Sequence, residues 1–388
     1  MASASTASVP LQTALQSAIP IWRDALRLPA PQAAAQLRRI YRENRATQGE
    51  LIFTGACSFQ CQHCIYPPSF ARHNKSIDGS GWDHILESMV RDCGIDTFVY
   101  GGRAVTADGA RVMTKLRESW PDVRIGMIDN GISMLPHMDA LAAVRADWID
   151  VSLDGLAADH DAQRGKVGSF EDGLRGAIRL KDGAFAPRVN ILTCLTTLNF
   201  RSVCAMIRQV NSLGFKNFFV TPITLGDGVG PAPELMLSRD QFAQFVAELR
   251  ETVADLDDAW VELLLFSADY ADYLASALPD FWRDCQTDRD SLFWDGGRPA
   301  SGADGANVLF IRYYPLSLTG VRELIVNTNG DVIVPKSMVA GKINDRSILG
   351  NLLEDSPRAL LAKLPDSNTF DYYCAELRRE AGLLRSVA

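Results

Sequence analysis

Short apolar runs alternate with longer amphipathic stretches from about residue 50 to residue 221. Six of the runs have the length and composition of strands and cover residues 51–54, 97–100, 124–128, 148–153, 188–193 and 217–221. The stretches between them have the apolar spacing of helices and cover residues 82–93, 108–119, 135–145, 170–181 and 201–213. Such alternation predicts parallel strands covered by helices, and six units fall short of the eight that close a full barrel. The chain is therefore predicted to be an α/β protein built on an open, partial (β/α)6 barrel of parallel strands.

The regions on either side of this core have different patterns. Residues 1–48 are rich in strong helix formers and are predicted to be helical. Two further helices are expected at 238–256 and 267–284, followed by a long polar loop at 286–306. Two apolar runs around an Asn-Gly-Asp turn predict a hairpin over residues 323–335. The predicted organisation is N-terminal helices (1–48), the barrel core (49–235), a helical connection with a lid-like loop (236–306) and a small C-terminal α+β extension (307–388).

Composition and charge are those of an ordinary globular protein. Of the 388 residues, 47% are hydrophobic and 22% are charged. No apolar run is long enough to span a membrane, and no basic residue precedes Arg23, so neither a membrane segment nor a secretory signal is expected. The eight cysteines are therefore expected to be reduced, in the cytoplasm, as ligands or buried thiols. The net charge of −8 argues against non-specific binding of nucleic acid.

Three of the cysteines form a Cys-x3-Cys-x2-Cys triplet directly after the first expected strand: Cys57, Cys61 and Cys64. Thiolates are soft ligands that select iron–sulfur clusters, zinc or cuprous copper over hard cations. A zinc site needs four nitrogen or sulfur ligands, and the triplet lacks the paired Cys-x2-Cys spacing of most such sites. The candidates for a fourth zinc ligand are His63, His73 and Cys93. The spacing therefore favours an iron–sulfur cluster and leaves zinc as the alternative.

The triplet resembles the signature of the radical S-adenosylmethionine (radical SAM) enzymes, in which an aromatic residue often precedes the last cysteine; His63 takes that place here. The block 152–165 begins Ser-Leu-Asp-Gly, continues through His160 and ends at Arg164-Gly, which resembles a pattern in the peptide-maturase branch of that family. The resemblance implies a 4Fe–4S cluster held by the three thiolates, with one iron open to SAM. It also implies one-electron cleavage of SAM to methionine and a 5′-deoxyadenosyl radical that abstracts a hydrogen atom from the substrate.

The resemblance further implies which residues contact SAM, all near the carboxyl ends of strands. Ser152 and Asp154 would hold the ribose hydroxyls, and Arg164 would bind the SAM carboxylate with two donors. The remaining implied contacts are His63, Gly101, Gly102, Asn130 and Thr221. The family usually has Gly-Gly-Glu where this chain has Gly-Gly followed by Arg103. A guanidinium cannot accept a hydrogen bond from the SAM ammonium group. Roles in turns and helix caps stay open as alternatives for these residues.

The C-terminal region resembles the SPASM or twitch extension, which holds auxiliary clusters in relatives, through its hairpin and the following Ile-Leu-Gly-Asn segment. Lys336 follows Pro335 where that extension has a cysteine, and only Cys285 and Cys374 are near. We therefore expect one 4Fe–4S cluster and no auxiliary cluster. Cys285, beside the expected lid loop, is a candidate hydrogen donor to a product radical, or else a buried small apolar residue.

The predicted function is radical SAM chemistry on a small or peptide-derived metabolite, in natural-product biosynthesis. A flavodoxin or ferredoxin is the expected reducing partner, and no nucleic acid or membrane is expected. The sequence leaves open whether the enzyme is an oxidoreductase, an isomerase or a lyase. One alternative is a ribosomal-peptide maturase that acts as an epimerase or cross-linking enzyme. The other is a binding protein stapled by zinc, without catalysis.

Overall fold

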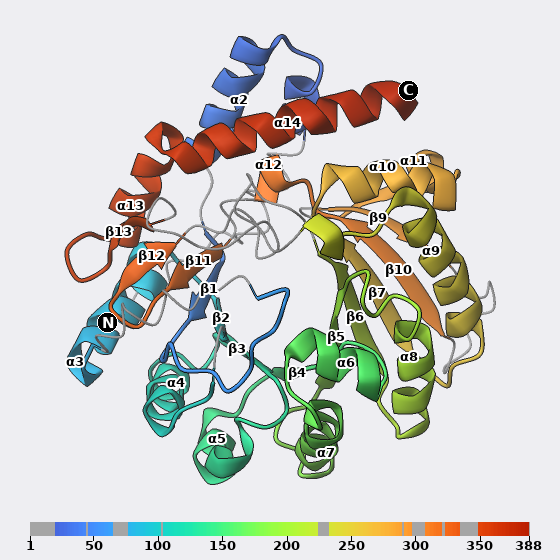
Figure 1. The fold of residues 1–388 in the computed structure, drawn as a ribbon. Coiled ribbons are helices and arrows are strands. Elements are labelled where there is room, and N and C mark those ends of the chain that lie inside the picture. Colours follow the sequence, from blue (N-terminus) through green and yellow to red (C-terminus); the bar gives the residue numbers. More distant parts are fainter. Residues whose placement is uncertain are drawn as a thin grey trace, which may run out of the picture.

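The computed structural model describes residues 20–43, 46–64, 77–101, 104–223, 233–288, 291–296, 307–319, 323–333 and 348–387 (Figure 1). Six strands lie side by side and parallel in chain order, as expected. They are β1 (Gln48–Leu51), β2 (Thr97–Tyr100), β3 (Arg124–Asp129), β4 (Trp148–Ser152), β5 (Val189–Leu195) and β6 (Asn217–Pro222). Strand β1 ends at Leu51 and not at Thr54 as expected, so the loop that carries the three cysteines begins earlier.

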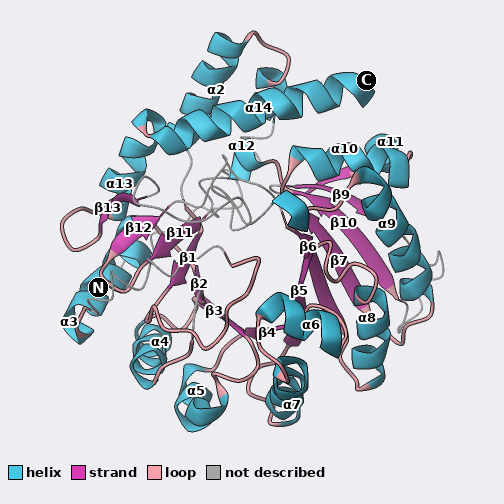
Figure 2. Ribbon diagram, viewed as in Figure 1, coloured by secondary structure: helices cyan, strands magenta, loops and turns pink. Residues whose placement is uncertain are grey.

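Helices cover the outer face of these strands (Figure 2). They are α3 (Gly79–Glu87) with its π-helical continuation η2 (Ser88–Asp92), α4 (Ala107–Ser119), η3 (Leu135–His137) with α5 (Met138–Val144), α7 (Ser169–Asp182) and α8 (Val203–Ser212). Their positions confirm the five predicted helical stretches. The sequence analysis did not predict α6 (Ala157–Arg164), which follows β4 and precedes α7.

The sheet continues beyond the six predicted strands at both edges. Strands β7 (Trp260–Leu265) and β10 (Val308–Tyr313) extend it in parallel beside β6, and β11 (Glu323–Val326) lies parallel to β1 on the other side. Short antiparallel strands finish the two edges: β9 (Ser291–Asp295) and β8 (Gln286–Asp288) at one, β12 (Asp331–Ile333) and β13 (Ile348–Asn351) at the other. The pair β11 and β12 confirms the predicted hairpin.

Two expectations need correction here. The long loop expected at 286–306 is wrong for its first part, because β8 and β9 lie there; residues 289–290 and 297–306 lie outside the described residues. Strands β7 and β10 were missed because Glu262 and Arg312 interrupt their apolar pattern. Once the strands are paired, the Arg312 Nε donates to Glu262 Oε2 at 3.1 Å, so both charges are compensated within the sheet.

Further helices follow the core. The connection holds η4 (Pro233–Leu235), α9 (Arg239–Ala254), α10 (Ala268–Ala277) and α11 (Phe281–Asp284); the C-terminal region holds α12 (Leu316–Thr319), α13 (Pro357–Lys363), η6 (Leu364–Asp366) and α14 (Asn368–Val387). Ser238 caps α9 in a capping box with Gln241, at the start of the helix that the sequence predicts over 238–256. Helix α14 packs against α2 (Ala30–Glu43), α10 and α12, and it crosses the open side of the barrel (Figure 1).

A buried polar cluster fastens α14 in that position. The Trp22 Nε1 donates to Ser317 Oγ at 2.8 Å and to Glu380 Oε2 at 3.3 Å, and the Ser317 hydroxyl also donates to Glu380. The Tyr41 hydroxyl donates to the Ser317 carbonyl at 2.9 Å. Only 1% of Glu380 is exposed. Three segments that are distant in sequence therefore meet at one carboxyl group.

Replacing Glu380 by Gln is expected to flatten the pH dependence of stability. Burial, opposed by the Ser317 hydrogen bond and reinforced by Glu376, raises the pKa of Glu380 from 4.5 to about 7. The folded state then holds a proton that the unfolded state loses, so the wild-type protein loses stability as pH rises from about 4.5 to 7, by about 3 kcal/mol. Urea unfolding from pH 4 to pH 8 should show Glu380→Gln more stable at pH 8, with the difference shrinking to about 1 kcal/mol at pH 5 and vanishing towards pH 4. Parallel profiles would contradict the expectation.

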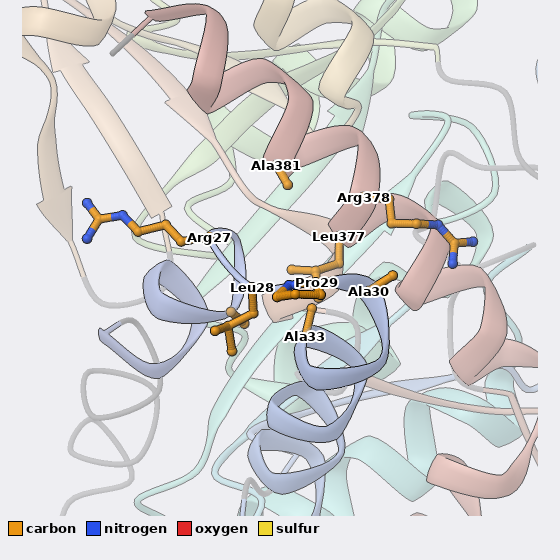
Figure 3. A pocket seen from close by; sticks show the side chains of 9 residues that line it. Arg27, Leu28, Pro29, Ala30, Ala33, Leu377, Arg378 and Ala381 are labelled. Carbon is orange, nitrogen blue, oxygen red and sulfur yellow. The ribbon is translucent and has the colours of Figure 1, made fainter.

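A pocket of about 440 Å³ lies between residues 25–33 and α14. Figure 3 shows its apolar lining, with the Arg27 and Arg378 side chains directed away on opposite sides. Its lining contains no thiol, carboxylate or imidazole, so it offers no group for the chemistry predicted above.

Among the described helices, none is long and apolar enough to cross a lipid bilayer.

Candidate functional site

The loop that carries the three cysteines leaves β1 at the carboxyl end of the parallel strands. The Ile52 N–H donates to the Val326 carbonyl at 2.9 Å, and the Ala104 N–H donates to the Ala56 carbonyl at 3.4 Å, so neighbouring segments hold the start of the loop. The Phe59 ring is buried, with 8% exposed, and anchors the middle of the loop. The three thiols are less buried: Cys57 is exposed, and Cys61 and Cys64 are half-buried.

The carboxyl end of α6 is the platform on which this loop rests. The Gln60 N–H donates to the Arg164 carbonyl at 3.2 Å, and the Gln62 N–H donates to the Gln163 carbonyl at 2.9 Å. Both acceptors belong to the last turn of α6, whose carbonyls have no partner within the helix. Gly165 ends the helix at φ 65°, and a Cβ there would press on the Gln60 carbonyl. The two segments that the sequence analysis singled out therefore contact each other through their backbones.

A buried ion pair lies beneath the contact. The Arg164 Nε donates to Asp154 Oδ2 at 2.5 Å, and the Arg164 Nη1 lies 4.0 Å from the Cys61 Sγ. The exposed fraction is 11% for the Arg164 side chain and 0% for that of Asp154. Burial alone would raise the pKa of Asp154, but the Arg164 charge, the His63 and His160 imidazoles and the Arg164 hydrogen bond together lower that pKa to about 2. The carboxylate is therefore charged at neutral pH.

The other contacts of Asp154 fix its direction. Its Oδ1 accepts the Cys194 N–H at 2.9 Å, its own N–H donates to His160 Nδ1 at 3.0 Å, and its carbonyl accepts the Asn199 side-chain amide at 2.6 Å. Both carboxylate oxygens thus have protein partners. The sequence analysis missed Asn199. The signal for it was a polar Thr-Thr-Leu-Asn segment directly after β5, and the Thr196 N–H indeed donates to Asn199 Oδ1 at 2.7 Å.

The imidazole of His63 lies in the same buried region. Burial lowers the pKa of His63 to about 4, although the nearby Asp154 charge acts in the opposite direction. The ring is therefore neutral at physiological pH. Its Nδ1 is buried, and among the described residues it has no hydrogen-bond partner. A buried polar atom of this kind fits a ligand that supplies the missing bond.

Burial also governs the thiol nearest the ion pair. It raises the pKa of Cys61 to about 11, although the Arg164 charge opposes the rise. A thiol with so high a pKa is a poor anion on its own, and a bound metal is the usual means of deprotonating it. Coordination would therefore change the charge of Cys61 beside Arg164.

The remaining expected SAM residues lie near other strand ends. Ser152 is buried at the end of β4, and Thr221 pairs in register with Cys194 across β6 and β5. Asn130 follows β3 and its Oδ1 accepts the N–H groups of Ile132 and Ser133 at 2.9 and 3.2 Å, so the turn role is met. Gly101 follows β2, and a Cβ there would press on the carboxylate of Glu50. Gly102, Arg103, Pro335 and Lys336 lie outside the described residues.

The described contacts of Cys285 are at the end of α11 and do not include the cysteine loop. Cys285 caps the end of α11, its Sγ donates to the Trp282 carbonyl at 3.5 Å, and it is half-buried. Burial raises the pKa of Cys285, and the nearby Arg23 charge opposes the rise. No described contact joins it to Cys57, Cys61 or Cys64, and its role as a hydrogen donor stays a prediction.

The donor set is of the kind that holds an iron–sulfur cluster. Thiolates bind the separate irons of such a cluster. Three cysteines lie on one loop, with a neutral imidazole and a guanidinium beside them, and these residues fit a 4Fe–4S cluster. Within the described part of the chain, no group of three His, Cys, Asp or Glu side chains is arranged to hold one metal ion.

Comparisons with known proteins concern the family and the fold. The family model described as "Radical SAM superfamily" matches residues 51–229. Pre-heme d1 synthase of Dinoroseobacter shibae is 21% identical over 169 residues, which are 43% of this chain and 41% of that protein. The chain thus matches less than half the length of this relative.

Two solved structures share the fold. The structure of anSMEcpe with bound AdoMet and Cp18Cys peptide has a TM-score of 0.53 and 15% identity, over 84% of this chain and 82% of the other. Streptococcus suis SuiB bound to its precursor peptide SuiA has a TM-score of 0.54 and 10% identity, over 82% of this chain and 65% of the other. Residues 51–229 therefore match a radical SAM domain, and this match supports an enzyme. Such a domain implies SAM and a 4Fe–4S cluster as cofactors, and it favours the enzyme over the zinc-stapled binding protein.

Proposed function

We propose that this enzyme cleaves SAM reductively at a single 4Fe–4S cluster held by Cys57, Cys61 and Cys64, and that it abstracts a hydrogen atom from a small or peptide-derived metabolite in natural-product biosynthesis. The observation that carries the proposal is the cysteine loop docked on α6 at the carboxyl ends of the strands. When bound, the cluster and SAM supply a 5′-deoxyadenosyl radical. A flavodoxin or ferredoxin is the proposed electron donor, and the cytoplasm is the proposed location.

The chain's own residues orient the reactants and exclude water. His63 is neutral, and its buried Nδ1 fits a hydrogen bond from the cofactor. Ser152 is buried at a strand end and fits a ribose hydroxyl. The other proposed SAM contacts are Gly101, Gly102, Asn130, Asp154, Arg164 and Thr221. Of these, Asp154 and Arg164 already bind each other, which favours a positioning role for the pair.

A ribosomal-peptide maturase is the second candidate. One observation favours it: two structures of the same fold are described with a peptide bound, the Cp18Cys peptide in anSMEcpe and SuiA in SuiB. The pre-heme d1 synthase, in contrast, is named for a small-molecule product. Low identity keeps both substrate classes open, and epimerisation or cross-linking would be the reaction of the peptide candidate.

The test is 5′-deoxyadenosine formation by anaerobically reconstituted protein given SAM and dithionite. Formation of 5′-deoxyadenosine is expected, with methionine in equal amount, because each cleavage yields one of each. A reconstituted protein with about four irons per chain that forms neither product, with peptide or metabolite extracts present, would overturn the proposal.

Replacing Cys285 and Cys374 together by Ala is expected to leave the iron content unchanged. The reason is that the proposed cluster uses only the loop cysteines, while Cys285 and Cys374 are half-buried and pack against the hydrophobic core. Iron and sulfide analysis of the reconstituted double variant checks this. A fall by several irons per chain would show that these two cysteines hold an auxiliary cluster.

A further inference from the structure

The ion pair of Asp154 and Arg164 lies against a cysteine of the loop, because the Arg164 guanidinium contacts both Asp154 and Cys61. We infer that Arg164, aimed by Asp154, is a positioning residue that sets the charge around the Cys61 sulfur and thereby raises the reduction potential of the cluster. The inference rests on the proposed function. It assigns Arg164 to the thiolate, and not first to the SAM carboxylate as the sequence analysis expected.

The geometry comes first. Arg164 is the last residue of α6, and its guanidinium spans two partners: its Nε meets Asp154 at 2.5 Å and its Nη1 lies 4.0 Å from the Cys61 Sγ. The same residue also holds the loop through its carbonyl, which accepts the Gln60 N–H next to Cys61. A planar guanidinium fixed at Nε has little freedom to turn its remaining donors elsewhere. The backbone carbonyl of Arg164 and its side chain therefore together fix the position of Cys61 relative to the guanidinium charge.

Stability alone does not account for the pair. Asp154 is fully buried and 11% of the Arg164 side chain is exposed, so both groups have lost most of their hydration. Desolvation offsets most of the attraction in such pairs, and apolar replacements of both partners are often equally stable. Three further hydrogen bonds nevertheless fix Asp154, from Cys194, to His160 and from Asn199. The site is built to hold a cation at one place.

That place matters for electron transfer. Reduction adds one negative charge to the cluster, and a cation near a ligating sulfur stabilises the reduced form. Hydrogen bonds to the ligating sulfur act in the same direction, and outer-shell partners of metal ligands tune the metal in this way. Asp154 orients the Arg164 guanidinium, and its negative charge partly offsets the effect of the positive charge of Arg164 on the cluster. The two residues should therefore shift the reduction potential in opposite directions.

The experiment is an anaerobic redox titration without SAM, followed by the EPR signal of the reduced cluster. One electron passes from dithionite to the cluster, and no bond forms or breaks. Arg164→Met should lower the midpoint potential, so that about tenfold less of the cluster is reduced at the wild-type midpoint, a shift of about 59 mV for one electron. Asp154→Asn should raise the potential. Arg164→Lys keeps the positive charge but loses the planar guanidinium that contacts Asp154 and Cys61 together. Its shift in midpoint potential should be smaller than that of Arg164→Met.

A neighbouring lysine gives the matched control. Lys166 also lies beside the loop, with its Nζ 4.8 Å from the centre of the Phe59 ring, but it has no contact with a cysteine in the described structure. Lys166→Met removes one positive charge near the loop without touching the ion pair. Its midpoint potential should stay at the wild-type value within error, which separates a directed contact from a general change of charge.

The outcomes decide between the two roles of Arg164. An unchanged potential in a fully loaded Arg164→Met, or a shift of the same sign in Asp154→Asn, would overturn the inference. A weaker SAM affinity with an unchanged potential would overturn it too and would assign Arg164 to SAM. If Arg164→Met fails to take up iron, Arg164→Lys and Asp154→Asn carry the test. A wild-type protein without cluster or 5′-deoxyadenosine would instead defeat the proposed function itself.

Discussion

Replacing Cys61 by Ala is expected to abolish both the cluster and the cleavage of SAM. Cys61 is the middle cysteine of the triplet, and the backbones of its neighbours on the loop, Gln60 and Gln62, are hydrogen-bonded to α6. Two thiolates cannot hold a site-differentiated cluster that needs three, so the iron content should fall from about four per chain to well below one. Formation of 5′-deoxyadenosine should fall below detection. Iron and sulfide analysis and product chromatography, both under anaerobic conditions, measure the two effects.

Cys204→Ala is the matched control, because Cys204 is a fully buried thiol in α8 and lies outside the cysteine loop. It should retain the iron content and the cleavage of SAM, which would show that loss of one thiol as such has no effect. A Cys61→Ala protein that keeps about four irons and still forms 5′-deoxyadenosine would contradict the cluster assignment and the proposed function with it.

The strands and the cysteines could be read from the sequence because their signals are local. Phe98-Val-Tyr in β2 is buried on both faces, and such a strand reads as a continuous apolar run. The cysteine triplet lies within eight residues of one loop, so its ligand spacing is visible without knowledge of the fold. The hairpin of β11 and β12 is equally local, because an Asn-Gly turn between apolar runs defines it.

The missed features depend on contacts between distant segments. The sequence predicts charged residues such as Glu262 and Arg312 to lie outside a sheet, and only the pairing of β7 with β10 makes their burial acceptable. The sequence analysis expected Asp154 and Arg164 to contact SAM, which stays a prediction, but it did not expect these two side chains to form an ion pair. In the structure the two buried charges compensate each other. Residues 60 and 164 meet only through the fold.

The docking of helices on strand ends also rests on close backbone contact. Gly131 follows Asn130 at φ 81°, and its carbonyl faces α7 at Gly176. A side chain at either position would separate the helix from the turn that carries Asn130. The glycines of α7 therefore help to position the turn that carries Asn130, which is a proposed SAM contact. A loss of stability on substitution of such a glycine would show that this close contact holds the turn in place.

Replacing Gly176 by Ala is expected to destabilise the fold by about 2–3 kcal/mol. Ala usually stabilises a helix relative to Gly by up to about 1 kcal/mol, so the sign here is reversed by packing. A Cβ at position 176 would overlap the carbonyl oxygen of Gly131, which is backbone and cannot rotate away. Anaerobic urea unfolding of the two proteins measures the difference.

The same substitution at Gly382 is the matched control for this prediction. Gly382 lies within α14, and a Cβ there would meet nothing within 4 Å. Gly382→Ala should therefore follow helix propensity and stabilise the protein slightly, by up to about 1 kcal/mol. Opposite signs at the two glycines would establish that α7 is packed on the turn after β3. A Gly176→Ala protein as stable as Gly382→Ala would show that the turn yields, and Asn130 would then have no fixed place beside SAM.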